Sequence, residues 1–402
     1  MQVLMVSTEY PPMQGGIGRY TANLTKALLG LGINVHVICD EKGDGDYSGI
    51  YPKNPHNSDV LLNLAKELEP DIVHVQFDPG LYGLISEQKI SGTYIDKFYA
   101  ECKIPIVTTF HSGLITQSQW ITPSSLVKKN GKLGKLGIPL RASLRYYKYF
   151  LNYKAFNNIT KQKLRISKSG IIFSHYMLKK FGDNYDFHAK CHVIYHGSDP
   201  AIYPPLNKKE ARERLSLPLN INDHRIALAY GFRTTGKGWE ILKKMNIPKG
   251  WIVLVNSSKD YYNREDLELS WQGANNIVDL QRGFLSEEEL TTLFYASDAV
   301  ILPYKVTAGS GVMFDALAHG LPFVATDLGF FREFAAQGLG ITAKRNANDF
   351  SKGLEDLDNN YIKYKAAVDM FKEKLKWNSV AKHHYRLYLD AMVAIKKTHS
   401  FE

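Results

Sequence analysis

A loop of small residues opens onto a helical segment in Ala308-Gly309-Ser310-Gly311-Val312-Met313-Phe314-Asp315-Ala316-Leu317-Ala318-His319-Gly320-Leu321-Pro322. It follows Ala299-Val300-Ile301-Leu302-Pro303, a short apolar run that is typical of a buried parallel strand. Val312, Ala316 and His319 recur at helical spacing. A strand, a small-residue loop and a helix in this order aim backbone N–H groups and a helix dipole at a phosphate. The pattern therefore predicts an α/β fold with a phosphate-binding turn.

A carboxylate lies close to this turn. Asp315 comes about one turn inside the predicted helix. An acid in that place is better suited to accept hydrogen bonds from sugar hydroxyls than to bind a phosphate. Together with Gly309, Ser310 and Gly311, and with Thr307 before them, Asp315 indicates a nucleotide-sugar pocket. The alternative is a core helix that follows an ordinary glycine turn.

A second turn in the same half carries two cations. Gly231-Phe232-Arg233-Thr234-Thr235-Gly236-Lys237-Gly238 follows the apolar run 226–230. Arg233 can bind a diphosphate through two parallel hydrogen bonds, and Lys237 can act as a point charge. These two residues are our candidates for neutralising a diphosphate leaving group, and the alternative is a solvated charged turn.

The amino-terminal half has its own glycine turn, Gly15-Gly16-Ile17-Gly18, after the strand predicted at 3–6. Gly15 and Gly16 would let the backbone approach a phosphate or sugar closely. A complete dinucleotide fingerprint is absent, because Thr21 stands where a third glycine would fall. Asp40 nevertheless follows the second strand at the place of a ribose-binding acid, so a NAD enzyme remains an alternative for this half.

Two histidines follow or interrupt apolar runs. His111 comes just past the strand predicted at 106–110, and ligands of open parallel sheets bind beyond the carboxyl ends of strands. We therefore predict that His111 contacts a sugar hydroxyl or a phosphate. His74 lies midway along its strand and is predicted to be structural.

The order of the predicted elements indicates the architecture. Apolar strands alternate with helical segments in both halves, which predicts two doubly wound α/β domains in tandem. A segment rich in Pro, Asn and charge, 199–225, is predicted to be the linker. The predicted domains are 1–200 and 201–376, and the chain is predicted to be helical from 349 onward, with a late break near Trp377.

The net charge of +10 is concentrated in one segment. Between Cys102 and Gly182 there is no Asp or Glu, but there are fifteen Lys and Arg residues interleaved with aromatic ones. Such a surface suits an anionic membrane or a lipid-linked substrate, and the candidate residues are Lys128, Lys129, Arg141, Arg145 and Tyr146. Single-stranded nucleic acid is a rival partner that we do not favour, and a solvated basic face is the remaining alternative.

The compartment follows from the cysteines and the hydropathy. Three cysteines, Cys39, Cys102 and Cys191, are far apart and form no Cys-x-x-Cys pair, so neither a disulfide framework nor a zinc site is expected. No uncharged apolar run approaches the roughly 20 residues needed to span a bilayer. We expect a cytoplasmic protein, peripheral on the inner face of the cell membrane.

In this order, the motifs resemble those of the retaining GT-B glycosyltransferases of family 4, which include phosphatidylinositol mannosyltransferases and lipopolysaccharide core transferases. The resemblance runs along nearly the whole chain and is carried by the segments 6–12, 15–20, 70–76, 105–111, 193–199, 231–238, 283–290 and 296–299 together with the pocket stretch. It implies two Rossmann-like domains that face across a cleft, with helices from about 377 to 402 returning to the first domain.

The resemblance also implies an activity: transfer of a hexose from a UDP- or GDP-linked sugar to an acceptor hydroxyl, with no metal and no further cofactor. The acceptor would be a lipid-linked or phosphorylated glycan. Where the family has Glu-x7-Glu, this chain has Thr307 and Asp315. Asp315 would hold the ribose, and the leaving phosphate would receive the acceptor proton. The alternatives are an inactive sugar-nucleotide-binding subunit and a GT-B epimerase or phosphorylase.

Overall fold

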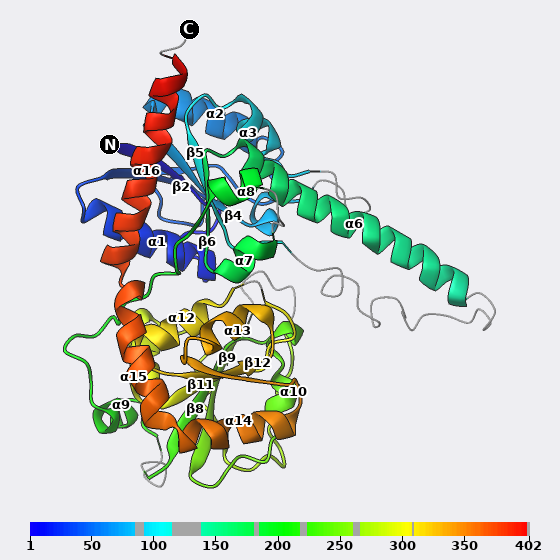
Figure 1. Ribbon diagram of the computed structural model, residues 1–402, viewed down its shortest axis with the longest axis vertical. Helices are drawn as coiled ribbons and strands as arrows, with labels where there is room; N and C mark the ends of the chain where they lie inside the picture. The colour runs from blue at the N-terminus through cyan, green and yellow to red at the C-terminus, as the bar shows by residue number, and fades with distance from the viewer. Residues whose placement is uncertain are drawn as a thin grey trace. The chain divides into compact units, whose positions relative to one another are not determined.

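The computed structural model of the chain describes residues 1–84, 92–114, 138–180, 185–217, 223–259, 266–307 and 309–399 (Figure 1). The chain forms two compact units. Unit 1 is Met1–Ile194 together with the chain from His383 onward, and unit 2 is Tyr195–Lys382. The division that the sequence predicts, at residues 200 and 377, lies close to these two boundaries.

Unit 1 is built on a parallel sheet with the strand order β3-β2-β1-β4-β5-β6-β7 in the part of the chain that the structure describes. The strands are β1 (Gln2–Val6), β2 (Asn34–Cys39), β3 (Tyr47–Ser48), β4 (Ile72–Phe77), β5 (Ile106–Phe110), β6 (Ser169–Ile172) and β7 (Cys191–Val193). The helices are α1 (Gly16–Leu29), α2 (Asn57–Leu68), η1 (Pro79–Tyr82), α3 (Asp96–Glu101), α6 (Ile138–Ile166), α7 (His175–Lys180), α8 (Tyr185–Lys190) and the larger part of α16 (Trp377–His399).

The two faces of this sheet differ in what covers them. On one face, His74 of β4 contacts Tyr388 of α16, and Tyr20 of α1 lies against the α16 residue His384. On the other face, Thr108 of β5 bonds to Tyr99 of α3 and to Ser167 at the end of α6. The return of the last helix to unit 1 therefore completes one layer of a three-layer α/β domain.

Unit 2 repeats this plan with the strand order β10-β9-β8-β11-β12-β13, all parallel among the described strands. The strands are β8 (Arg225–Phe232), β9 (Trp251–Ser258), β10 (Ile277–Asp279), β11 (Ala299–Leu302), β12 (Phe323–Thr326) and β13 (Gly340–Ala343). The helices are α9 (Lys208–Arg214), η4 (Thr235–Lys237), α10 (Trp239–Leu242), α11 (Glu287–Tyr295), α12 (Gly311–Ala318), α13 (Gly329–Ala335), α14 (Ala347–Asn359), α15 (Tyr361–Phe371) and η5 (Lys372–Leu375).

The core of unit 2 forms because its strands are apolar on both faces. Trp251, Val253 and Val255 of β9 pack with Trp239 of α10 and Phe350 of α14 in one buried cluster. Local signals fix the ends of the helices. In α11, for example, Ser286 and Glu289 form a reciprocal capping box that satisfies the first amide groups.

The segment that the sequence predicts as a linker is not a free connection. Residues 199–225 contain α9, which begins with a capping box between Asn207 and Glu210 and buries Ala211 and Arg212. The prediction failed here because Pro, Asn and charge are as common in caps and in buried ion pairs as in linkers.

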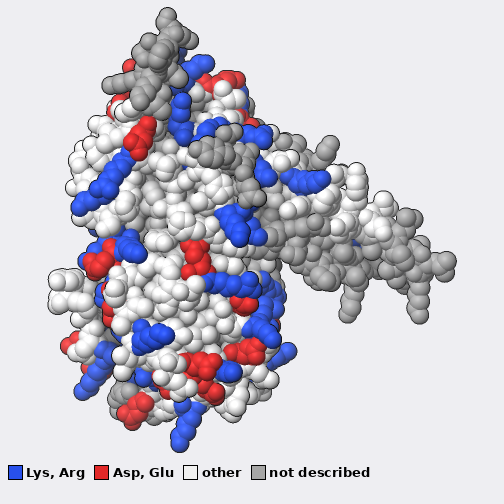
Figure 2. All heavy atoms as spheres, viewed as in Figure 1, with Lys and Arg blue, Asp and Glu red and all other residues white. Residues whose placement is uncertain are grey.

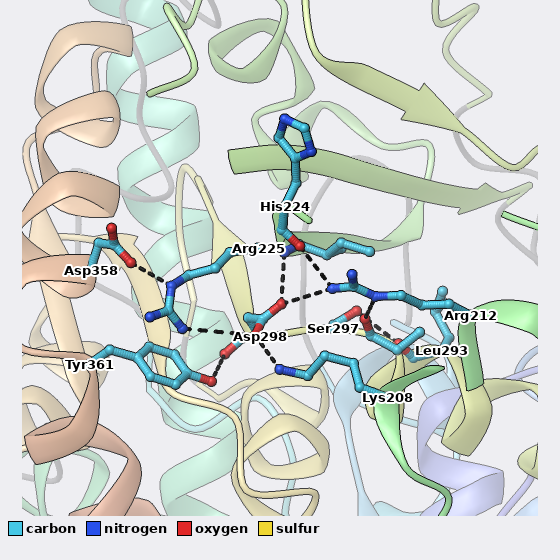
Figure 3. Close-up of polar contacts among 11 residues, drawn as sticks. Lys208, Arg212, His224, Arg225, Leu293, Ser297, Asp298, Asp358 and Tyr361 are labelled. Atoms are coloured by element: carbon cyan, nitrogen blue, oxygen red, sulfur yellow. Dashed lines mark hydrogen bonds and ion pairs between the residues drawn. The ribbon is translucent and has the colours of Figure 1, made fainter. Parts of the chain in front are cut away.

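A polar cluster around Asp298 explains why α9 is held in place (Figure 3). The Asp298 carboxylate is buried; it forms an ion pair with Lys208 and accepts hydrogen bonds from Arg212 Nη2 at 3.2 Å and from the Ile226 amide at 2.9 Å. The Tyr361 hydroxyl donates to the Asp298 carbonyl at 3.0 Å. Because Asp298 directly precedes β11, this cluster lies at the amino edge of the sheet and stabilises unit 2 away from the ligand edge.

Candidate functional site

The strand order of unit 2 locates its ligand edge. In open parallel sheets, ligands bind beyond the carboxyl ends of the strands at the point where the strand order reverses. In unit 2 this point lies between β8 and β11, which are direct neighbours. The two loops that follow these strands meet, because the Lys305 amide donates to the Gly236 carbonyl at 2.9 Å. A Cβ at Gly238, which has a φ of 74°, would overlap the Pro303 carbonyl, so this close approach requires glycine.

Lys237 stands at this junction. Its Nζ donates to the Tyr304 hydroxyl at 2.8 Å and lies 4.1 Å from the centroid of the same ring. The lysine stem packs against Gly231, where an added Cβ would come within 3.2 Å of Lys237 Cε. No carboxylate of the described residues forms an ion pair with Lys237, so its charge is not neutralised by the protein itself within that part of the chain. An ammonium held in this way is suited to an anionic ligand.

Arg233 is placed differently from Lys237, although both follow β8. Its Nε donates to Asp266 Oδ1 at 2.8 Å, and both side chains are about one-third exposed. This hydrogen bond lowers the pKa of the Asp266 carboxyl. A diphosphate would have to compete with Asp266 for Arg233. The two predicted cations therefore differ, because Arg233 has an ion-pair partner among the described residues and Lys237 has none there.

The small-residue loop lies before α12 as predicted, although Ala308 falls outside the described residues. Ser310 caps α12, because its Oγ accepts from the Met313 amide at 3.2 Å, and Gly311 is the first helical residue. The Thr307 hydroxyl bonds to the Gly309 carbonyl and accepts from the Gly309 amide at 3.2 Å. Thr307 therefore orders its own loop.

Asp315 lies in α12 and is only 2% exposed. Its Oδ1 accepts a hydrogen bond of 2.6 Å from the Ser198 hydroxyl. Sequence reasoning missed Ser198 as a partner, because 117 positions separate the two residues. The neighbouring His196 stacks on Phe314 with ring centroids 5.8 Å apart, and its Nε2 lies beside Gly311. The segment 195–198 therefore lines the start of α12.

In unit 1, His111 follows β5 and is half-buried. Its backbone amide donates to the Phe77 carbonyl at 3.0 Å, which continues the pairing of β5 with β4. Its ring packs on Tyr20 and Phe173, with centroids 5.1 and 5.3 Å away, and its Nε2 lies 2.9 Å from Gln76 Oε1. His74 is fully buried in β4 and bonded to Tyr388 and Thr109, so its predicted structural role is confirmed.

The glycine turn before α1 encloses a carboxylate of the protein. Glu9 is 3% exposed, and its Oε1 accepts from the Gly18 amide at 3.1 Å. A Cβ at Gly15 would overlap this carboxylate, whereas one at Gly16 would meet nothing within 4 Å. A pyrophosphate cannot share the amino end of α1 with Glu9, and this argues against the dinucleotide alternative. A contact of Gly15 or Gly16 with a sugar stays a prediction.

The basic segment contains α6, whose amino-terminal part runs out from the sheet of unit 1 (Figure 1). Leu144 and Tyr147 are 63% and 62% exposed there, whereas Ile159, Lys163 and Leu164 are buried near the other end. Tyr146 is also exposed and stacks on Phe150 with centroids 6.3 Å apart, and Arg145 is half-buried. Lys128 and Lys129 lie outside the described residues, as does the side chain of Arg141.

The surface of this projecting part is free of acidic side chains. Where its atoms are described, Figure 2 shows blue and white but no red, whereas both signs of charge mix over unit 2. No helix among the described residues has the length and apolar character needed to cross a bilayer. In the same residues, His, Cys, Asp and Glu form no group of three or more that could hold a metal ion.

Two family models match the chain, one in each half. "Glycosyltransferase Family 4" matches residues 14–202, and "Glycosyl transferases group 1" matches residues 241–360. An uncharacterized glycosyltransferase of Methanocaldococcus jannaschii is 24% identical over 419 residues, which cover 98% of this chain and 99% of that protein. The first match contains the Gly15 turn and His111, and the second contains the whole α12 region.

Solved structures share the fold along the full chain. Sucrose-phosphate synthase of Thermosynechococcus elongatus superposes with a TM-score of 0.69 at 14% identity, covering 98% of this chain and 100% of that one. HepE of Anabaena, solved with UDP and glucose, gives 0.61 at 14% identity, with 96% and 99% covered. WaaG, a glycosyltransferase of lipopolysaccharide biosynthesis, gives 0.55 at 14% identity, with the same coverage. These likenesses show the GT-B fold, which confirms the predicted architecture.

Proposed function

We propose that this chain, a glycosyltransferase of family 4 with the GT-B fold, moves a hexose from a nucleotide diphosphate sugar to an acceptor hydroxyl and retains the anomeric configuration. The observation that carries the proposal is the position of Lys237. Its ammonium lies at the reversal point of the unit 2 sheet, where the loops after β8 and β11 meet. A fixed cation at this place suits a leaving diphosphate.

The donor is bound by groups that differ in their tasks. Lys237 stabilises the charge that develops on the diphosphate, and the amides of Ser310 and Gly311 at the start of α12 support it, whereas the Gly309 amide is bonded to Thr307. Asp315 holds the ribose through its carboxylate, which Ser198 orients. Arg233 contributes when the diphosphate displaces Asp266 from its guanidinium.

The bond changes in this reaction balance without another reactant. The bond between the anomeric carbon and the diphosphate oxygen breaks, and a bond to the acceptor oxygen forms on the same face. The proton of the acceptor hydroxyl passes to the departing phosphate. In this scheme His111 of unit 1 contacts the transferred sugar.

A screen of nucleotides tests the donor class. We expect UDP or GDP, and their sugar conjugates, to raise the melting temperature of unit 2, because a ligand that binds only the folded state stabilises it. The structure of HepE with UDP and glucose favours UDP as the first compound to try. No shift with any nucleoside diphosphate would refute the proposal. A proton NMR spectrum of the product then decides between retention and inversion.

For the acceptor, we propose a lipid-linked or phosphorylated glycan at an anionic membrane on the cytoplasmic side. The support is the projecting part of α6, where exposed Leu144, Tyr146 and Tyr147 lie next to Lys148 and no acid occurs. Such a surface favours membrane binding, because aromatic rings are stable at headgroup depth and lysines are attracted to anionic lipid.

Vesicle sedimentation tests the membrane proposal. The full chain should bind vesicles that contain phosphatidylglycerol and should not bind neutral ones. Replacing Lys148, Lys154 and Lys161 by Glu should release it, since each lysine contributes about 1 kcal/mol near such a surface. The matched control replaces Lys42, Lys53 and Lys66, which lie elsewhere in unit 1, and should bind as before. Equal binding of both variants would contradict the proposal.

One observation favours a second candidate, a subunit that binds a sugar nucleotide without turnover. Thr307 supplies no charge and is engaged with Gly309. Donor hydrolysis and transfer assays on the purified chain separate the two functions. Tight nucleotide binding with no turnover for any sugar would favour the subunit.

A further inference from the structure

We propose that the Tyr304 hydroxyl is a second hydrogen-bond donor to the leaving diphosphate, next to the Lys237 ammonium. The inference rests on the proposed function for the identity of the ligand. The donor itself follows from contacts within unit 2, because Lys237 lies in the connection that follows β8 and Tyr304 in the loop that follows β11.

The bond between Lys237 and Tyr304 does not use the hydrogen of the hydroxyl. Lys237 Nζ lies 2.8 Å from the Tyr304 oxygen and is the donor, because an ammonium has three hydrogens and no lone pair. A phenol oxygen can accept such a bond and still donate its own hydrogen. Among the described residues, Lys237 is the only hydrogen-bond partner of the Tyr304 hydroxyl. Its hydrogen is therefore available to a ligand.

The ammonium and the hydroxyl hydrogen lie on different sides of the phenol oxygen. Lys237 Nζ is over the Tyr304 ring, 4.1 Å from the centroid, and so it approaches the oxygen from outside the ring plane. The O–H bond of a phenol lies in the ring plane, because the oxygen is conjugated with the ring. The bond from Lys237 also polarises the hydroxyl and makes it a stronger donor. Two donor atoms 2.8 Å apart can contact one phosphate group together.

The fold holds Tyr304 in a fixed position. Its residue is 5% exposed, and its ring packs at a steep angle on Phe331 of α13, with centroids 5.7 Å apart. Both of its neighbours in the chain contact the loop after β8. The Pro303 carbonyl fills the place that a Cβ at Gly238 would take, and the Lys305 amide donates to a carbonyl of η4. A donor fixed in this way needs no reorganisation when charge develops on the ligand.

The hydroxyl should act on the rate more than on binding of the sugar donor. When the bond to the anomeric carbon breaks, negative charge collects on the diphosphate oxygen before the acceptor proton reaches it. A donor to this part of the ligand stabilises the transition state more than the bound nucleotide sugar. Loss of the hydroxyl should therefore lower kcat and leave KM for the sugar donor nearly unchanged.

Calorimetry with the full chain tests the donor without any transfer. The probes are UDP, GDP and inorganic pyrophosphate. Tyr304→Phe removes only the hydroxyl and keeps the ring that packs on Phe331. We expect this variant to bind the probes roughly tenfold more weakly than the wild type, the loss for one hydrogen bond to a charged group. Unchanged affinity for the probes that the wild type binds would overturn the proposal.

The matched control is Tyr361→Phe. The Tyr361 hydroxyl donates to the Asp298 carbonyl at 3.0 Å, at the amino edge of the same sheet. This variant also loses one hydrogen-bonded hydroxyl of unit 2, and it should bind all three probes as the wild type does. An equal loss of affinity in Tyr361→Phe and Tyr304→Phe would overturn the proposal.

A double variant separates a direct contact from an indirect one. If the Tyr304 hydroxyl served only to hold Lys237, then Tyr304→Phe would change nothing once Lys237 is replaced by Met. We expect Lys237→Met/Tyr304→Phe to bind the diphosphate roughly threefold more weakly than Lys237→Met, as for one hydrogen bond that the ammonium no longer polarises. Equal affinity of these two variants would overturn the direct contact.

A transfer assay distinguishes this inference from the proposed function. Tyr304→Phe should lower kcat roughly tenfold with little change in KM for the sugar donor, and an unchanged kcat would overturn the contact with the leaving group. Absence of transfer by the wild type would instead refute the proposed function, and pyrophosphate binding would still decide whether Tyr304 donates to an anion. A wild type that binds none of the three probes would overturn both.

Discussion

Replacing Lys237 by Met should lower the rate of sugar transfer about a hundredfold. Methionine keeps an unbranched stem that can pack against Gly231, and it removes the ammonium that bonds to Tyr304 at 2.8 Å. The loss therefore reports on charge rather than on packing. The unfolding free energy should change little, because Lys237 ends the short helix η4, is not buried and has no ion-pair partner among the described residues.

Two estimates of the magnitude agree. Unit charges about 4 Å apart attract by about 4 kcal/mol at an effective dielectric constant of about 20. Removing one fixed donor that faces a developing oxyanion costs about 3 kcal/mol in enzymes where it has been measured. Since about 1.4 kcal/mol corresponds to a factor of ten in rate, the smaller estimate gives a loss of roughly a hundredfold and the larger one a loss approaching a thousandfold, so we expect a loss of about a hundredfold or more.

The assay is single-turnover transfer at saturating acceptor, with binding of the nucleoside diphosphate measured by calorimetry. Lys305→Met is the matched control, because Lys305 follows β11 at the same edge but lies 3.6 Å from Glu240 and is 40% exposed. The control should stay within about twofold of the wild type, since exposed pairs contribute at most about 1 kcal/mol. A Lys237→Met variant that is no slower than this control would refute the role of Lys237.

Three further predictions concern buried groups. Asp298→Asn should lower the free energy of unfolding of unit 2 by about 3–5 kcal/mol, because it removes the counterion of the Arg212 guanidinium, which is only 4% exposed. The double variant Asp298→Asn/Arg212→Met should recover part of this loss, and urea unfolding followed by tryptophan fluorescence measures both variants. Asp315→Asn should weaken nucleoside diphosphate binding roughly tenfold, the loss for one hydrogen bond to a charged group, while the side chain can still accept from Ser198; equal affinity by calorimetry would overturn this role. The stability of unit 1 should fall as the pH drops below about 6.5. Burial lowers the pKa of His74 in the folded chain, so below this pH the unfolded chain binds a proton at His74 that the folded chain does not. The melting temperature of His74→Gln should therefore depend less on pH in that range.

The sequence allowed the architecture and the glycine turn that carries Lys237 to be predicted, because both leave local signals. Strands such as β9 and β11 are continuous apolar runs, and the glycines around Lys237 mark the turn that the structure shows between β8 and α10. The small residues Ser310 and Gly311 likewise mark the start of α12, as the structure shows. In each of these cases a few neighbouring residues are sufficient to determine the feature.

The remaining features depend on contacts between distant residues. Nothing near Asp315 in the sequence points to Ser198, and nothing near Arg233 points to Asp266. The carboxylate under the Gly15 turn could have been suspected, since Glu9 stands in the same loop, but its burial was not visible. The contact of Gln76 with His111 gave only a weak signal in the sequence. Gln76 and His74 are the two polar residues of β4, a strand whose other residues are apolar and which is buried throughout.

The most direct test of the account is a crystal structure of the full chain soaked with UDP or GDP. We expect the diphosphate beside Lys237 and the amides that begin α12, with the ribose at Asp315. A nucleotide bound at the amino end of α1, or anywhere away from the junction of the β8 and β11 loops, would contradict it.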